Sequence, residues 1–265
     1  MNAPVLVVRD LTVSVLQDRQ PRAVVDGISF DLAEGEILAL VGESGCGKTK
    51  TAEALLGLVP ASAGSVSAQS IVLGGTNLAA LPESAMRRVR GRDISMVFQE
   101  PLTALDPVFR TGHQLSAVFR RHRRLGRSEA RRASLEMLER VGFADAGHVL
   151  RSYPHELSGG MRQRVVIAMA MACRPRVLVA DEPTTALDVT TQAQVLTRLT
   201  ELAGEAGTAI LLITHDLGIV AHYCDRALIM RDGRIVEQAA VDQLFRQPRH
   251  PYTARLLAAA RGEAP

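Results

Sequence analysis

The chain has no tryptophan and few aromatic residues of any kind. Aromatic residues make up 3% of its 265 residues, whereas hydrophobic residues make up 47%. The chain can therefore form a sizeable core, but that core must be built from leucine, valine, alanine and isoleucine. The length fits one large domain, or one domain with an insertion.

Cysteine, long apolar runs and strong net charge are also scarce. Cys46, Cys173 and Cys224 are widely spaced, which excludes a disulfide framework or zinc site and favours a reducing cytosol. No apolar run approaches the ~20 residues of a membrane span. The start of the chain has no signal-peptide pattern, so we expect a soluble chain, which leaves docking on a membrane protein open. A net charge of +3 does not indicate nucleic-acid binding.

Lysine is rarer still, because 29 of the 31 basic residues are arginine and only Lys48 and Lys50 are lysine. Both belong to, or follow directly after, the segment Gly42-Glu43-Ser44-Gly45-Cys46-Gly47-Lys48-Thr49. An apolar run at 37–41 precedes this segment and a helical pattern at 52–56 follows it, so the order predicts a phosphate-binding P-loop. Lys48 would reach the β- and γ-phosphates and the Thr49 hydroxyl would bind Mg²⁺. Lys50 is either a phosphate contact or a solvated surface residue.

The remaining patterns predict an α/β fold in which an antiparallel β layer comes first. Residues 61–75 are small and polar and are expected to form a loop, broken by an apolar run at 71–73. The other expected strands are 5–8, 11–15, 27–32, 94–98, 177–182 and 209–214, with a closing hairpin over 227–237. The expected helices are 82–92, several within 102–140, a run that follows Leu157–Gln163 and reaches Cys173, then 190–202, 241–246 and 252–261.

Polar residues stand at the ends of two of these strands. Asp181 and Glu182 end the strand at 177–182, where Asp181 can hold Mg²⁺ through water and Glu182 can orient or deprotonate a water. His215 ends the strand at 209–214, although a lone histidine is more often structural. Ser158-Gly159-Gly160 at a helix start offers a second anion-binding arrangement, which alone is a weak signal. The arginines between 120 and 132 form either an anionic partner surface or a solvated helix pair.

Taken together and in their order along the sequence, these motifs make the chain resemble the ATP-binding subunits of ABC transporters over almost its full length. By this resemblance Gln99 corresponds to the Q-loop glutamine and Leu157–Gln163 to the signature motif. Asp181 and Glu182 correspond to the Walker B pair, Ala186–Asp188 to the D-loop and His215 to the switch histidine.

A narrower resemblance points to the peptide and nickel importers of this family. It rests on Phe98–Pro107, on Met161 in the signature motif and on the Pro248–Thr253 tail with its His-Pro-Tyr. The chain shows no cysteine cluster after this tail, which favours a short nickel- or metallophore-type member. The family usually places an aromatic residue before the P-loop to stack on adenine, and Leu11–Val25 contains none.

The resemblance implies a P-loop NTPase of ABC type, with a mixed central sheet, an antiparallel β layer and a helical subdomain. It implies one nucleotide-binding domain over 1–265, with a core at 1–98 and 165–240, a helical subdomain at 100–164 and a tail at 241–265. ATP and Mg²⁺ are the implied cofactors. The implied catalytic residues are Glu182, His215 and Gln99. The implied nucleotide contacts are Gly42–Lys50, Ser158, Gly159, Gly160 and Asp188, and the implied Mg²⁺ ligands are Thr49, Gln99 and Asp181.

The resemblance also implies partners and a place in the cell. The partners are membrane permease subunits, a second ABC ATPase subunit in a heterodimer or homodimer, and a solute-binding protein, with no nucleic acid. The place is the cytoplasmic face of the bacterial inner membrane. The implied activity is ATP hydrolysis that powers uptake of peptides, nickel or a metal chelate. A soluble ABC ATPase of DNA repair or translation is the alternative, but the chain shows neither a long coiled-coil insertion nor tandem units.

Two parts of the chain carry further expectations, the segment after Gln99 and Cys46. We expect the segment after Gln99 to touch the permease, so that substitutions at Leu105 or Val108 uncouple transport from hydrolysis. We also expect Cys46 to be a reactive thiol, because a helix N-terminus and Lys48 favour the thiolate. The alternative for Cys46 is a small, packed and inert residue.

Overall fold

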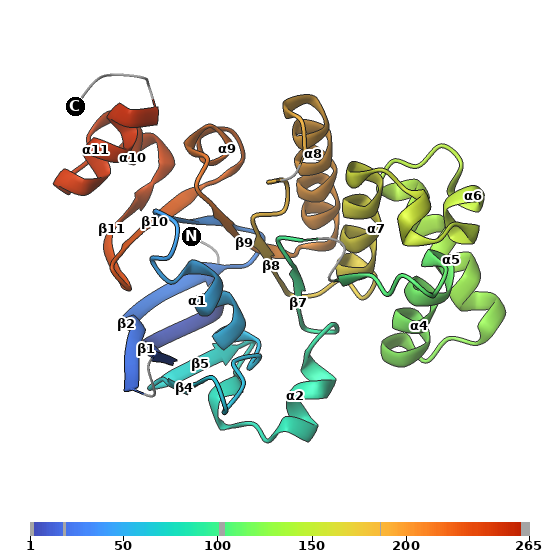
Figure 1. Cartoon of the computed structure of the whole chain (residues 1–265), viewed down its shortest axis with the longest axis horizontal. Helices are drawn as coiled ribbons and strands as arrows, with labels where there is room; N and C mark the ends of the chain where they lie inside the picture. Colours follow the sequence, from blue (N-terminus) through green and yellow to red (C-terminus); the bar gives the residue numbers. More distant parts are fainter. Residues whose placement is uncertain (1–2, 18–19, 101–103, 186, 261–265) are drawn as a thin grey trace. The chain divides into compact units, whose positions relative to one another are not determined.

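The structure is a computed structural model that describes residues 3–17, 20–100, 104–185 and 187–260. Its chain divides into two compact units, Met1–Met86 with Ala209–Pro265, and Arg87–Thr208, which we call unit 1 and unit 2 (Figure 1). The predicted boundary at residue 165 falls inside a helix, α7 (Gly159–Met171). The division into a core, a helical subdomain and a tail stays a prediction.

Unit 1 begins with the predicted antiparallel sheet, in the order β2-β1-β5-β6 with β4 also paired to β1. Its strands are β1 (Pro4–Gln17), β2 (Gln20–Ala33), β4 (Gly64–Ser67), β5 (Ser70–Leu73) and β6 (Thr76–Asn77). The expected loop over 61–75 is therefore wrong at β4, whereas β5 lies on the apolar run at 71–73 that was expected to break the loop. β4 is mostly exposed and joins the sheet through its backbone, so its small polar side chains gave no apolar signal.

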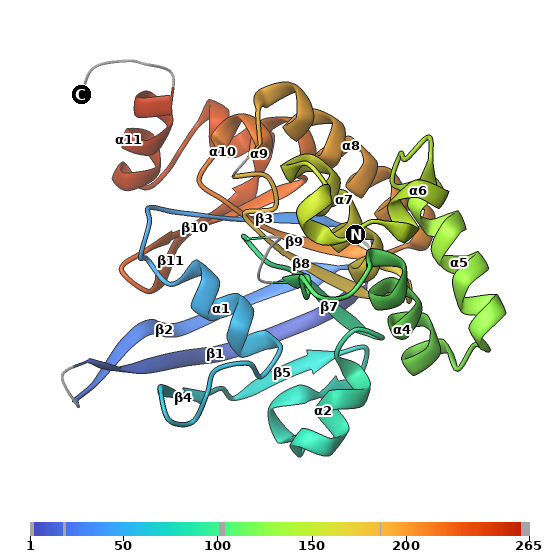
Figure 2. The same ribbon diagram turned by 45° about the vertical axis from the view of Figure 1, so that its right-hand side comes forward.

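The parallel strands of unit 1 lie around β3 (Ile37–Val41), which pairs with β9 (Ala209–Thr214) and β10 (Arg226–Arg231). β11 (Arg234–Ala240) closes the predicted hairpin by pairing antiparallel with β10. The helices are η1 (Leu78–Ala80), α1 (Lys48–Leu55), α9 (Leu217–Tyr223), α10 (Val241–Arg246) and α11 (Pro251–Ala260). Figure 2 shows α10 and α11 beside the β10–β11 hairpin. Val41, Ile229, Leu244 and Tyr252 share one buried core, so the tail helices belong to it.

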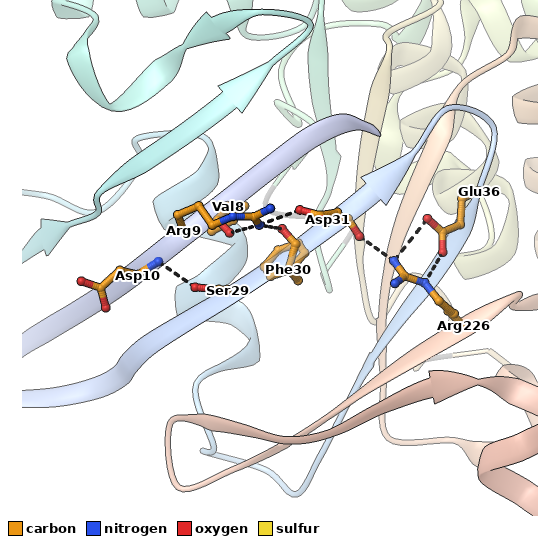
Figure 3. A network of polar contacts seen from close by, with 8 residues as sticks. All are labelled: Val8, Arg9, Asp10, Ser29, Phe30, Asp31, Glu36 and Arg226. Carbon is orange, nitrogen blue, oxygen red and sulfur yellow. Dashed lines mark hydrogen bonds and ion pairs between the residues drawn. The ribbon is translucent and has the colours of Figure 1, made fainter. Parts of the chain in front are cut away.

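An ion-pair network ties the antiparallel sheet to the parallel strands of unit 1 (Figure 3). Arg226 on β10 pairs with Glu36, Nε to Oε1 at 2.6 Å, and donates from Nη2 to the Asp31 carbonyl on β2 at 2.6 Å. The Asp31 carboxylate in turn pairs with Arg9 on β1 at 2.6 Å. Because the Arg226 guanidinium is planar and holds Asp31 on β2 and Glu36 just before β3 at once, it fixes the spacing of β10 from these two segments.

Unit 2 contains the parallel pair β7 (Ile94–Val97) and β8 (Val177–Asp181). Its helices are α4 (Thr111–Arg123), α5 (Arg127–Arg140), α6 (Ala146–Arg151), η2 (Pro154–Glu156), α7 and α8 (Val189–Ala206); α2 (Glu83–Val89) lies where the chain passes from unit 1 to unit 2. The core is mostly aliphatic and includes two phenylalanines, Phe119 on α4 at 1% exposed and Phe143 at 7%. The arginines between 120 and 132 are exposed, so both readings of that cluster stay open. Within the described ranges, no helix has the length and apolar character that crossing a membrane requires.

Candidate functional site

The loop between β3 and α1 has a backbone that requires glycine at two positions. Gly47, the N-cap of α1, has φ 109°, and a Cβ there would lie 2.3 Å from the Val24 carbonyl oxygen. A Cβ on Gly42 would lie 2.2 Å from the Met230 carbonyl oxygen. Gly45 has φ 83° but faces open space. Two glycines thus allow close backbone packing and the third allows the turn.

Lys48 is held inside this loop. Its side chain is 6% exposed, and its Nζ donates to the carbonyl oxygens of Gly42 at 2.8 Å and Glu43 at 2.9 Å. An ammonium has three N–H donors, and the third points toward the Cys46 Sγ, a weak acceptor 4.0 Å away. Thr49 in the first turn of α1 is exposed. The loop therefore presents one buried positive charge and one accessible hydroxyl at a helix N-terminus, an arrangement suited to phosphate.

The structure opposes the prediction that Cys46 carries a stabilised thiolate. Cys46 is 9% exposed, and burial raises the pKa of its thiol, although Lys48 acts in the opposite direction. A Cβ on Gly42 would lie 2.7 Å from the Cys46 Sγ, so the sulfur fills space inside the loop. The alternative of a packed, small residue fits these observations.

The outer side of the loop contacts the C-terminal part of the chain. The Glu43 N–H donates to the Tyr252 hydroxyl at 3.3 Å, and the Gly233 N–H donates to the Cys46 carbonyl at 3.1 Å. A cavity of about 330 Å³ opens beside these contacts. Its walls include Gln17, Arg22, Ala23, Val24, Glu43, Ser44, Gly45, Cys46, Arg231, Asp232, Gly233 and Tyr252. Sequence reasoning noted the His-Pro-Tyr tail but assigned Tyr252 no role at this site.

Unit 2 brings two predicted catalytic residues together. Gln99, just beyond β7, donates from Nε2 to the Glu182 Oε2 at 3.1 Å across 83 residues of sequence. The Thr185 hydroxyl donates to the same carboxylate oxygen at 2.9 Å. Glu182 has φ 45°, which is uncommon for a residue with a side chain and is often found at functional sites. Asp181, the last residue of β8, is 2% exposed.

The signature and D-loop residues begin two helices of unit 2 that lie against each other. The Ser158 hydroxyl caps α7 by accepting from the Met161 N–H at 3.3 Å. The Asp188 carboxylate caps α8 by accepting from the Thr191 N–H at 2.9 Å, a hydrogen bond that lowers the pKa of Asp188. A Cβ on Gly160 would lie 2.6 Å from the Thr191 methyl carbon, so only glycine allows this contact.

The other predicted site residues include some that stand apart from these contacts and some that lie outside the described residues. His215 is exposed and directly follows β9, in unit 1. Pro101–Thr103 of the predicted Q-loop segment and Ala186 of the predicted D-loop lie outside the described residues. The expectation that Leu105 touches a partner is wrong, because its side chain is 2% exposed and belongs to the core. Val108 and Phe109 are large hydrophobic residues of this segment that are exposed, at 69% and 46%.

Comparison with known protein families identifies the family to which the chain belongs. The sequence model of the family described as "ABC transporter" matches residues 25–185. The chain belongs to the ABC transporter family. This membership confirms the predicted family and the predicted class of enzyme, an ATPase.

Individual relatives are also similar to this ABC protein. The peptidoglycan transport ATP-binding protein of Agrobacterium fabrum is 50% identical over 99% of this chain and 48% of its own length. The oligopeptide transport ATP-binding protein of Bacillus subtilis is 47% identical over 95% of this chain and 77% of its own length. The glutathione import ATP-binding protein of Escherichia coli O157:H7 is 48% identical over 96% of this chain and 42% of its own length. The chain thus spans about half the length of the Agrobacterium relative.

Solved structures confirm the predicted fold. A dimeric ATP-binding cassette in a post-hydrolysis state, bound to ADP and phosphate, has a TM-score of 0.78 at 23% identity, covering 89% of this chain and 98% of the other. A dimeric bacterial ABC transporter cassette also has a TM-score of 0.78, at 24% identity and with the same coverage of both chains. At these identities the likeness shows the fold alone.

Proposed function

We propose that this chain is the ATP-binding and hydrolysing subunit of a bacterial ABC importer, and that its substrates contain peptide bonds. The observation that carries the proposal is the glycine loop with Lys48 buried inside it. All three relatives named above carry "transport" or "import" in their names, which disfavours the alternative of a DNA-repair or translation ATPase. Their names mention peptidoglycan, oligopeptide and glutathione, which favours peptide-containing solutes over nickel.

The phosphates of ATP would bind in the glycine loop, over the residues Gly42–Lys50. The N-terminus of α1 and the loop N–H groups would face the phosphate oxygens, and Lys48 would add a fixed positive charge. Lys48 does not need to be recruited from solvent, since two carbonyl oxygens already hold it in the loop. Lys50 pairs with Glu53 at 2.6 Å, so its proposed contact with phosphate would be made by a partly neutralised group.

Thr49, Gln99 and Asp181 are proposed as Mg²⁺ ligands, because a hydroxyl, an amide oxygen and a carboxylate are each hard oxygen ligands. When bound with ATP, Mg²⁺ would supply neutralisation of the phosphate charge. We propose Glu182 as the general base or orienting group for the attacking water, with Gln99 and Thr185 holding its carboxylate. His215 is proposed as a further catalytic residue at the γ-phosphate.

The remaining proposed contacts involve a second ATPase subunit. Ser158, Gly159, Gly160 and Asp188 would close over the nucleotide of that subunit in a head-to-tail pair, which would be a heterodimer or a homodimer. Two solved cassettes of the same fold are dimeric, which supports a pair of ATPase subunits. Membrane permease subunits and a solute-binding protein complete the proposed complex, and the ATPase pair would work at the cytoplasmic face of the inner membrane.

The test is reconstitution of the chain with the membrane permease subunits of the proposed complex. Uptake of a labelled di- or oligopeptide and ATP hydrolysis should both require the wild-type chain, and both should be lost with Lys48→Ala. Hydrolysis without peptide uptake in a complex that imports another solute would overturn the substrate class. Failure of the wild-type chain to bind nucleotide would overturn the proposal as a whole.

A further inference from the structure

We propose that Tyr252 of the C-terminal tail is a positioning residue for the phosphate loop. The proposal rests on the nucleotide-binding role argued above and adds a residue to it that lies 209 positions away from the loop. Together with Gly233 on the β10–β11 turn, Tyr252 forms what we call the tail clamp. All its contacts lie within unit 1.

The first contact of the tail clamp reaches the second residue of the loop. The Glu43 N–H donates to the Tyr252 hydroxyl at 3.3 Å, while the Glu43 carbonyl accepts from Lys48 Nζ at 2.9 Å. Glu43 is thus held on both sides, because its N–H contacts the tail and its carbonyl contacts Lys48. A change in the Glu43 backbone would move the acceptor on which Lys48 rests.

The second contact reaches the other end of the loop. The Gly233 N–H donates to the Cys46 carbonyl at 3.1 Å, and the Gly233 carbonyl accepts from the Asp26 N–H at 2.9 Å. Gly233 has φ 81°, and a Cβ there would lie 3.0 Å from the Val24 carbonyl oxygen. The turn is therefore packed tightly between β2 and the loop, and the two contacts hold residues 43 and 46 from the outside.

Tyr252 itself is rigidly placed. Its side chain is 4% exposed, and the Arg231 guanidinium lies over its ring at 5.0 Å. The Tyr252 N–H donates to the His250 Nδ1 at 3.2 Å, and the His250 N–H donates to the Glu237 carboxylate at 2.9 Å on β11. Burial raises the pKa of the phenol, so at neutral pH the hydroxyl stays protonated and uncharged beside the loop.

A loop held from the outside before nucleotide arrives loses less conformational freedom on binding, so the bound form is favoured. Because Tyr252 acts on the loop backbone, its contribution should be the same for every nucleoside triphosphate. This separates a positioning residue from a residue that contacts the base, whose removal would change the preference between ATP and GTP.

The experiment is a titration of the full chain with ATP and with GTP, beside its melting temperature. Tyr252→Phe removes the hydroxyl and keeps the ring under Arg231. We expect binding of both nucleotides to weaken about fivefold, the effect of one neutral hydrogen bond. Arg231→Met, which frees the ring but keeps an apolar stem, should weaken both in the same direction. Tyr223→Phe, the same change at the end of α9, is the matched control and should bind both nucleotides as the wild type does.

Several outcomes would overturn the proposal. Unchanged affinity in Tyr252→Phe would do so, and so would a loss confined to ATP, which would indicate a base contact instead. A loss that disappears when the titration is repeated well below the melting temperature of the variant would show partial unfolding as the cause. Failure of the wild type to bind either nucleotide would instead refute the proposed function, so the two proposals fail separately.

Discussion

Replacing Glu182 by glutamine should remove a proton acceptor while leaving the local contacts nearly unchanged. Gln99 and Thr185 both donate to the same carboxylate oxygen, Oε2, at 3.1 and 2.9 Å. The amide oxygen of the Glu182→Gln variant can take the place of that oxygen and accept both hydrogen bonds. Its NH₂ group then occupies the position of the other carboxylate oxygen, so no donor faces another donor across these two contacts.

The expected loss of stability and the expected rise in the reaction barrier differ enough to be measured separately. Hydrogen bonds to a charged group contribute about 1.5–3 kcal/mol, against about 0.5–1.5 kcal/mol for neutral ones. Glu182 is half-buried, so solvent reduces this difference, and the loss in stability for two bonds should stay near ~1–2 kcal/mol. Loss of a general base, by contrast, slows a reaction by roughly 10²- to 10⁴-fold, which is at least ~2.7 kcal/mol in the barrier.

The assay measures the ATPase rate in the assembled complex, the affinity for ATP and the melting temperature of the chain. Glu182→Gln should hydrolyse ATP at least ~100-fold more slowly, with ATP affinity within a few-fold of the wild type. Thr185→Val is the matched control, because it removes one hydrogen bond and keeps the carboxylate; its rate should fall less than ~10-fold. Near-normal hydrolysis by Glu182→Gln, or an equal loss in Thr185→Val, would refute the assignment.

Three further predictions concern other residues of the two units. Val108→Asp should reduce uptake more than basal ATP hydrolysis, and cross-links that place Val108 far from the permease would contradict this. Leu105→Ala should instead lower the free energy of unfolding by about 2–5 kcal/mol, since Leu105 is in the core. Cys46 should react slowly with alkylating reagents at pH 7 and faster as pH rises, because burial raises the pKa of its thiol and only the thiolate reacts. Rapid inhibition of ATP hydrolysis by the reagent at pH 7, absent in Cys46→Ser, would contradict this. Val15→Tyr should strengthen ATP binding several-fold, since stacking on an aromatic ring contributes roughly 1–3 kcal/mol, and equal ATP affinity in variant and wild type would refute it.

The strand pattern supports the last of these predictions. Val15 and Gln17 lie on the same face of β1, because side chains alternate along a strand, and Gln17 lines the cavity beside the loop. A tyrosine at Val15 would therefore project on the cavity side. Val24, which lines the cavity from β2, belongs to the segment Leu11–Val25 that contains no aromatic residue.

Secondary structure was predictable wherever the signal was periodic and apolar. The strands at β3, β8 and β9 are buried along most of their length, and their apolar runs identified them. Two expected strands at 5–8 and 11–15 proved to be one strand, β1, with an irregular register around Asp10, whose φ is 51°. β4 was missed because its place in the sheet depends on backbone pairing with β1, and its own residues carry no apolar pattern.

The sequence by itself determined the glycine loop and its lysine, because the spacing of Gly42, Gly47 and Lys48 encodes backbone angles and reach that depend on nearest neighbours alone. Only the tertiary structure decided which distant groups support these residues. Gln99 meets Glu182 across 83 residues and Tyr252 meets Glu43 across 209, and no local pattern records either contact. The burial of Leu105 three residues from the exposed Val108 was decided in the same way. Such contacts follow from how helices and strands pack against one another, which depends on the whole fold.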